Sequence, residues 1–209
     1  MKKPIVTFAG SAASPQQFPK DGLPEVAFLG RSNVGKSRLL NSLVGVRGLA
    51  RVSARPGRTQ LVNFFRLDDA LYLVDLPGYG YARVPEAVRR GFEALVTAYL
   101  ARGEIALCVF LVDARHEPME GDQVLHRFLC EEGLPYVVAA TKSDKLGRGA
   151  LAQRIQAVNK DLGARAEAVL AVSAETKLGV PELWRVIREM AAGGRADGDG
   201  RGGARARVG

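Results

Sequence analysis

The chain has 209 residues, of which 47% are hydrophobic, which suffices for one sizeable core and is short for two independent domains. Lys and Arg total 30 against 22 Asp and Glu, and this net charge of +8 favours a polyanionic partner such as RNA. Two cysteines, Cys108 and Cys130, argue against a disulfide framework, and the lack of a signal-peptide pattern or a long apolar span predicts a cytoplasmic protein that does not bind a membrane.

The first segment, residues 1–23, carries three prolines, and we expect an extended lead-in outside the core. From Glu25 onward, short apolar runs alternate with longer amphipathic stretches, which predicts an α/β fold with helices on both faces of a mostly parallel sheet. The predicted strands are Glu25–Leu29, Gln60–Leu67, Ala70–Asp75, Ile105–Val112, Pro135–Thr141 and Ala168–Val172. The predicted helices are Lys36–Leu43, Pro85–Ala101, Gly121–Glu132, Ala150–Leu162 and Val180–Ala192.

The connections refine this sheet. The run 105–112 is apolar without alternation, as expected of a central strand covered on both faces. Only Asp68 and Asp69 separate the second and third predicted strands, so these two should form an antiparallel hairpin at the sheet edge. The prediction is therefore six strands in one domain, residues 24–192, followed by a disordered tail rich in Gly and Arg, residues 193–209.

A phosphate-binding loop is predicted between the first strand and the first helix. Gly30-Arg-Ser-Asn-Val-Gly-Lys-Ser37 matches GxxxxGK[ST] in the strand-to-helix context that the motif requires. Backbone N–H groups at the start of the helix would surround the phosphates, the Lys36 ammonium would neutralise the outer ones, and the Ser37 hydroxyl could bind Mg²⁺.

A second acidic motif follows the third strand. Asp75-Leu-Pro-Gly78 lies at the carboxyl end of that strand, where Asp75 could hold Mg²⁺ through water and the Gly78 N–H could contact a terminal phosphate. Between the two motifs, Thr59 is the one threonine of an arginine-rich loop and could complete the Mg²⁺ site, as a switch threonine does. Taken alone, each of these features is also typical of an ordinary turn or surface loop.

Two further strand ends predict selection of a base. Thr141-Lys-Ser-Asp144 resembles the NKxD motif of GTPases, with Thr in place of Asn. The Asp144 carboxylate can accept hydrogen bonds from N1–H and the exocyclic amine of guanine, a donor pair that adenine lacks. Lys142 would lie along the base with its methylene stem, and Val172-Ser173-Ala174 resembles the SA[KL] element beside guanine.

Four segments, GRSNVGKS, PGRTQ, DLPGYGYA and TKSDK, together resemble the EngB family, a member of the TrmE-Era-EngA-EngB-septin-like P-loop GTPases, over about residues 4 to 192. The resemblance implies a six-stranded Ras-like domain, Mg²⁺-dependent GTP binding and hydrolysis, a role in assembling the large ribosomal subunit, and a link to cell division and septation. It also implies a partner, the large subunit or its precursor with its rRNA and proteins, and we expect the chain itself to be a monomer.

The family's functional positions transfer to matching residues of this sequence. Catalytic roles fall on Lys36, Thr59 and Gly78, and Mg²⁺ falls on Ser37, Thr59 and, through water, Asp75. The nucleotide contacts fall on Gly30, Arg31, Ser32, Asn33, Val34, Gly35, Lys36, Ser37, Gly57, Arg58, Thr59, Gln60, Leu61, Asp75, Leu76, Pro77, Gly78, Thr141, Lys142, Ser143, Asp144, Val172, Ser173 and Ala174.

The hydrolytic machinery departs from that of Ras-like enzymes at one position. Tyr79 follows the Asp-x-x-Gly motif where those enzymes have a Gln that orients water, so unaided hydrolysis should be slow. Two hypotheses for Asn33 stay open, a loop Asn bonded to its own backbone and a residue that helps to hold K⁺ beside the phosphates. Arg58 and Arg83 could act as internal arginine fingers, although solvated arginines are the commoner case.

Two rival functions stay open on sequence alone. An ATP-using P-loop enzyme would share the phosphate loop without needing Lys142 and Asp144, and an RNA-binding assembly factor could carry a vestigial nucleotide site. His116 and His126 lack companions at metal-ligand spacing, which argues against zinc. Basic residues that could contact rRNA, or could simply be solvated, are Arg83, Arg89, Arg90, Arg102, Arg154, Arg185 and Arg188.

Overall fold

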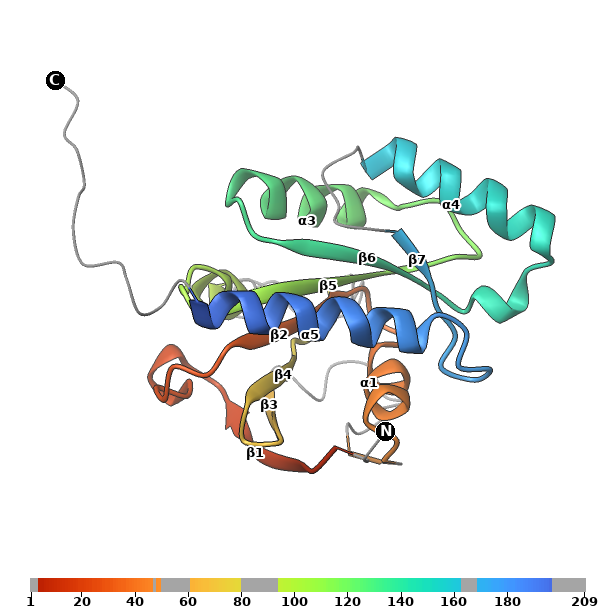
Figure 1. The fold of residues 1–209 in the computed structure, drawn as a ribbon. Helices are drawn as coiled ribbons and strands as arrows, with labels where there is room; N and C mark the ends of the chain where they lie inside the picture. Colours follow the sequence, from red (N-terminus) through yellow and green to blue (C-terminus); the bar gives the residue numbers. More distant parts are fainter. Residues whose placement is uncertain (1–3, 47, 50–60, 80–93, 163–168, 197–209) are drawn as a thin grey trace, which may run out of the picture.

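A seven-stranded sheet forms the middle layer of the computed structural model, which describes residues 4–46, 48–49, 61–79, 94–162 and 169–196 (Figure 1). The strand order across the sheet is β1-β3-β4-β2-β5-β6-β7. The strands are β1 (Val6–Ala12), β2 (Glu25–Gly30), β3 (Val62–Leu67), β4 (Leu71–Asp75), β5 (Ile105–Asp113), β6 (Tyr136–Thr141) and β7 (Val169–Ala171). The labelled helices are α1 (Lys36–Val44), α3 (Glu120–Glu131), α4 (Arg148–Leu162) and α5 (Val180–Ala196), with short 3-10 turns at Pro15–Gln17 and Ser143–Lys145.

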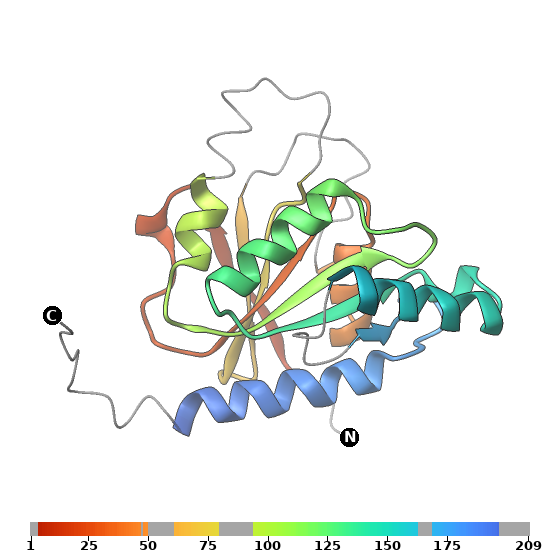
Figure 2. The same cartoon turned by 90° about the horizontal axis from the view of Figure 1, so that it is seen from above.

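Helices cover the two faces of this sheet in separate groups. Along β2, Val26 and Phe28 pack on the face that α1 and α5 cover, whereas Ala27 and Leu29 pack on the face of α3 and α4. Figures 1 and 2 show these two helix pairs on opposite sides of the strands. The apolar run of β5 alternates in the same way between the two cores, which confirms its predicted position inside the sheet.

The predicted hairpin between the second and third strands is confirmed. β3 and β4 pair antiparallel, and the two turn residues Asp68 and Asp69 both have positive φ, 49° and 52°. Two consecutive left-handed residues make the primed turn whose twist matches that of the flanking strands, and Asp tolerates this region better than most residues. The Ala70 N–H donates to the Leu67 carbonyl at 2.8 Å and closes the turn.

The prediction for residues 1–23 was wrong in one respect. It placed the segment outside the core, whereas part of this segment belongs to the sheet. β1 pairs antiparallel with β3, so the sheet has seven strands and not six. Ala12 and Phe18 are buried in the core. This strand is hard to recognise from local hydrophobicity because β1 is an edge strand whose side chains are mostly exposed, with Phe8 at 58%. The α/β class and the antiparallel pairing at this end of the sheet are confirmed.

The bounds of the other predicted helices and strands agree with the observed bounds to within one to four residues, where the structure describes them. Helix α5 continues to Ala196, four residues beyond its predicted end, and the rest of the predicted tail lies outside the described residues. Of the predicted helix 85–101, residues 94–100 are helical and the earlier part lies outside the described residues. Both cysteines are free thiols, and none of the described helices is long and apolar enough to cross a bilayer.

A buried ionic cluster closes the amino end of the central strands. Glu25 is the first residue of β2 and is 1% exposed, and its carboxylate lies 3.3 Å from the Arg102 guanidinium. Arg102 also donates to the Pro19 carbonyl at 2.7 Å and stacks over the Phe18 ring. Burial raises the pKa of Glu25 to about 7, more than the Arg102 charge lowers it.

We expect this carboxyl to make stability fall with rising pH. Its folded pKa of about 7 exceeds the ordinary 4.5, so the neutral carboxyl is favoured in the folded protein. Its contribution to the free energy of unfolding is fully present below pH 4.5 and is lost as pH rises through about 7. Between pH 5 and 8, the free energy of unfolding should fall by about 2 to 3 kcal/mol more for the wild type than for Glu25→Gln. Urea unfolding at several pH values measures this difference.

Glu104→Gln is the matched control, because that carboxylate contacts the same guanidinium from a side chain that is 39% exposed. Its pH dependence should follow that of the wild type. Parallel curves for the wild type and Glu25→Gln would contradict the assignment.

Candidate functional site

The phosphate-loop sequence connects β2 to α1, as predicted. β2 ends at Gly30, where a Cβ would lie 2.9 Å from the Leu111 carbonyl oxygen, so only glycine fits against β5. Asn33 and Gly35 have positive φ, 62° and 105°, and turn the loop into α1, which begins at Lys36. The start of α1 therefore directs its free backbone N–H groups toward the space that the loop encloses.

The Asp-Leu-Pro-Gly turn lies directly against this loop. The Ser32 N–H donates to the Tyr79 carbonyl at 2.9 Å, and a Cβ on Gly78 would lie 2.9 Å from the Ser32 nitrogen. At the end of β4, the Asp75 carboxylate forms an ion pair with the Lys36 ammonium. Two motifs about forty residues apart in sequence thus share one edge of the sheet, as predicted.

The end of β6 is tied to the same loop. The Thr141 hydroxyl, which replaces the Asn of the NKxD motif, is shared between the carbonyl oxygens of Val34 at 2.7 Å and Val112 at 3.0 Å. The hydroxyl is buried, and these two acceptors share its single proton. The threonine thus joins the ends of two neighbouring strands to the phosphate loop.

Lys142 crosses from β6 to the phosphate loop. Its ammonium donates to the Asn33 carbonyl at 2.8 Å and forms an ion pair with Asp113 at 2.8 Å. Burial acts to raise the pKa of Asp113, but hydrogen bonds from Arg115 and Lys142 hold it well below its usual range. Asp113 ends β5 and was not predicted as a site residue, because a single carboxylate at a strand end matches no motif.

Asp144 is held as a carboxylate by neighbours on two loops. The Ser173 hydroxyl donates to Oδ1 at 2.7 Å, and the Lys145 ammonium lies 3.0 Å from Oδ2. The hydrogen bond from Ser173 is the main cause that lowers the pKa of Asp144. Ser173 accepts in turn from the backbone N–H groups of Glu175 and Thr176. The structure thus brings the Val172–Ala174 segment next to Asp144.

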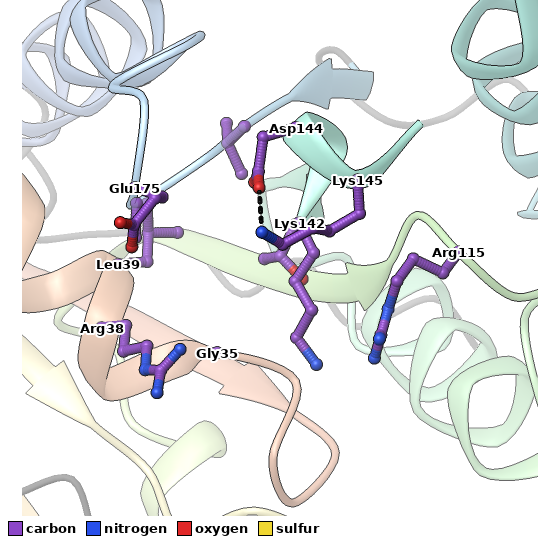
Figure 3. A pocket seen from close by; sticks show the side chains of 11 residues that line it. Gly35, Arg38, Leu39, Arg115, Lys142, Asp144, Lys145 and Glu175 are labelled. Atoms are coloured by element: carbon purple, nitrogen blue, oxygen red, sulfur yellow. Dashed lines mark ion pairs between the residues drawn. The ribbon is translucent and has the colours of Figure 1, made fainter. Parts of the chain in front are cut away.

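A cavity of about 290 Å³ opens between these segments, and Figure 3 shows its wall. Predicted residues from three motifs line it, namely Gly35, Thr141, Lys142, Asp144, Val172 and Ala174. Arg38 and Glu175 also line it and were not predicted, since each lies one residue outside a motif, and Arg115 follows the end of β5, where the sequence has no motif. The cavity combines an apolar side from Leu39 and Val172 with the Asp144 carboxylate, which suits a flat polar ring.

The remaining predicted positions divide into two groups. Ser37 lies in the first turn of α1, Leu76 and Pro77 are buried in the turn after β4, and Leu61 precedes β3. Ser143 is buried, and its hydroxyl donates to the Ala140 carbonyl at 2.7 Å. Gly57, Arg58, Thr59, Gln60 and Arg83 lie outside the described residues. Their roles, and the ligand roles of the others, stay predictions.

Comparison with known proteins gives a consistent result. A family model described as "50S ribosome-binding GTPase" matches residues 25–142. The probable GTP-binding protein EngB of Geobacter metallireducens is 42% identical over 200 residues, which cover 95% of this chain and 98% of that protein. The corresponding protein of Bacillus subtilis is 42% identical over 182 residues, which cover 86% and 93%.

Solved structures share the fold. A crystal structure of a probable GTP-binding protein engB superposes with a TM-score of 0.69 at 24% identity, over 80% of this chain and 98% of that one. Era in complex with MgGDPNP and a 16S ribosomal RNA fragment superposes with a TM-score of 0.66 at 22% identity, over 80% and 56%.

The contact between the two loops predicts the effect of a single methyl group. Gly78→Ala would place a Cβ 2.9 Å from backbone of Ser32, which cannot move without shifting the phosphate loop. We expect a loss of about 1 to 3 kcal/mol in the free energy of unfolding, measured by urea denaturation. Gly149→Ala is the control, since nothing lies within 4 Å of a Cβ there and α4 favours alanine. Equal stability of the two variants would contradict this contact.

Proposed function

We propose that this chain, which belongs to the EngB family of GTP-binding proteins, acts as a slow GTPase switch in assembly of the large ribosomal subunit. One observation carries the proposal: the phosphate loop, the Asp75–Gly78 turn and the Thr141–Asp144 segment lie together at one edge of the sheet, joined by direct contacts. That edge is the carboxyl end of the parallel strands, where open α/β sheets bind ligands.

Asp144 would select guanine. Its carboxylate lines the cavity, has a pKa lowered by the hydrogen bond from Ser173, and can accept from the two donors on one edge of guanine. An adenine in the same position would leave this carboxylate facing an acceptor. The Leu39 and Lys142 side chains, which line the same cavity, would contact the faces of the base.

Magnesium would be held by hydroxyl and carboxylate oxygens beside Lys36. Ser37 in α1 and Asp75 at the end of β4 would supply the hard oxygen ligands that Mg²⁺ requires, Asp75 through water, and Thr59 would add a third. When bound, Mg²⁺ neutralises charge on the outer phosphates. A potassium ion held with the help of Asn33 is a further proposal; this residue of the phosphate loop is exposed and has a positive φ of 62°.

Hydrolysis by the chain alone should be slow. Tyr79 occupies the position after the Asp-x-x-Gly motif, and its hydroxyl donates to Asp122 on α3 at 2.6 Å, so it is engaged by the protein. A partner would have to complete the water-positioning machinery, which suits a timer that leaves its partner after hydrolysis. Catalytic contributions would come from Lys36, Thr59 and the Gly78 N–H.

The large ribosomal subunit or its precursor is the partner that we propose, with rRNA as its polyanionic component. The net charge of +8 and the family description support it. Arg102, which the sequence analysis considered as an rRNA contact, is instead ion-paired inside the protein, with a side chain that is 13% exposed. The same proposal includes a cytoplasmic location and a monomeric state. It also includes a cellular role, in which loss of the protein would disturb cell division and septation.

Nucleotide selectivity tests the proposed base pocket. Calorimetry should detect GDP binding and no comparable ADP binding, and Asp144→Asn should weaken GDP binding by about a hundredfold, because an amide presents an unmatched donor to guanine. Asp161→Asn, at the exposed end of α4, should bind as the wild type does. Equal affinity for GDP and ADP would favour the rival ATP-using enzyme.

Ribosomal particles test the proposed partner. The chain should sediment with 50S subunits in the presence of a non-hydrolysable GTP analogue and less in GDP, and the subunits should raise phosphate release by about tenfold or more. The release assay in KCl and in NaCl also tests the potassium proposal. An RNA-binding factor with a vestigial nucleotide site would sediment without any stimulated release.

A further inference from the structure

The side chain of Tyr79 connects the Asp75–Gly78 turn to helix α3. Its hydroxyl donates to Asp122 Oδ1 at 2.6 Å, and Asp122 is 3% exposed. The other oxygen of Asp122 accepts from the Met119 N–H at 2.8 Å, which caps the start of α3. Both oxygens of this carboxylate are therefore engaged, one by the helix and one by the turn.

The backbone of Tyr79 is held equally firmly on its other side. Its carbonyl accepts from the Ser32 N–H at 2.9 Å, and Arg31 pairs with it in a parallel bridge. Gly78, one residue earlier, lies against the Ser32 backbone with no room for a side chain. Tyr79 thus joins three parts of the protein, which are the phosphate loop, the turn and α3.

The phenol ring fits closely over the start of α3. A Cβ on Gly121 would lie 3.2 Å from Tyr79 Cε2 and 3.3 Å from Cδ2, so the ring already rests against the helix backbone. Burial first, and the Asp122 charge second, raise the pKa of Tyr79 well above its usual range. The phenol therefore keeps its proton and remains a donor to Asp122.

The geometry points to Asp122 as a positioning residue: through Tyr79, it fixes the turn so that the Gly78 N–H meets the terminal phosphate of GTP. This inference rests on the proposed function, in which Gly78 contacts that phosphate. A turn held in place before binding loses less entropy when GTP binds, whereas GDP gains nothing from it because the terminal phosphate is absent. Asp122 thereby acts on the preference for GTP over GDP.

Tyr79→Phe tests this inference because it removes the hydroxyl and keeps the ring. We expect affinity for a non-hydrolysable GTP analogue to fall about tenfold while affinity for GDP changes less than about twofold, a ratio that a general loss of stability would not alter. Titration calorimetry with both nucleotides measures the ratio.

Tyr136→Phe is the matched control. The Tyr136 hydroxyl lies 2.8 Å from His126 Nε2 in the middle of α3 and 3.6 Å from Cys130 Sγ near its end, so this variant also removes a phenol hydroxyl that contacts α3, but away from Tyr79. Tyr136→Phe should leave the GTP to GDP ratio unchanged, whatever its effect on stability. A similar change of ratio in both variants would overturn the inference.

Gly121→Ala provides a second variant that keeps both the hydroxyl and the carboxylate. Its methyl group would displace the Tyr79 ring by a few tenths of an ångström, while alanine favours the helix. The ratio should fall by about threefold. An unchanged ratio in both Tyr79→Phe and Gly121→Ala, with normal wild-type binding, would overturn the positioning role alone, whereas a wild type that binds neither nucleotide would overturn the proposed function itself.

Discussion

The site depends on two places where backbone segments touch directly, with no side chain between them. Gly30 passes the Leu111 carbonyl, and Gly78 passes the Ser32 nitrogen, each with space for a hydrogen and not for a methyl group. Because the loops touch through backbone, their N–H groups and the Lys36 and Asp75 side chains lie within one small volume. Glycine is therefore required at both positions because a Cβ would clash with the neighbouring backbone, and its conformational freedom matters less.

Around that contact, Lys36 and Lys142 are each placed by a carboxylate from a different element. Lys36 of α1 pairs with Asp75 of β4, and Lys142, which follows β6, pairs with Asp113 of β5. These charged groups come from four neighbouring elements, so their positions depend on the strand order as much as on the motifs. The pairs are partly buried, where charge interactions are screened less by salt than at the surface.

The sequence predicted those parts of the site that repeat a pattern and missed those that depend on a single partner. The phosphate loop could be predicted because glycine spacing, a preceding strand and a following helix all constrain the same eight residues. Asp113 and Asp122 could not be predicted, because each is one carboxylate whose role depends on a residue remote in sequence, Lys142 or Tyr79.

The errors in the fold have the same cause. β1 is stabilised by its pairing with β3, so its own exposed side chains carry little hydrophobic pattern. Arg102 read as a surface cation because the short segment around it does not reveal the buried carboxylate of Glu25, which lies about eighty residues earlier. In both cases the contact that determines the structure joins residues far apart in sequence, so the local hydrophobic pattern does not predict it.

Strand β2 runs from the buried Glu25–Arg102 cluster to the phosphate loop. β2 begins at the buried Glu25 and ends at Gly30 of the phosphate loop, a span of about 17 Å at the usual rise per residue. Every residue between them is buried and packs against helices on both faces, so the strand has little freedom to bend. Protonation of Glu25 therefore changes how stable the fold is, while the geometry of the phosphate loop is set by local backbone contacts at the opposite end. The carboxyl whose protonation changes stability and the phosphate loop therefore lie at opposite ends of the same strand.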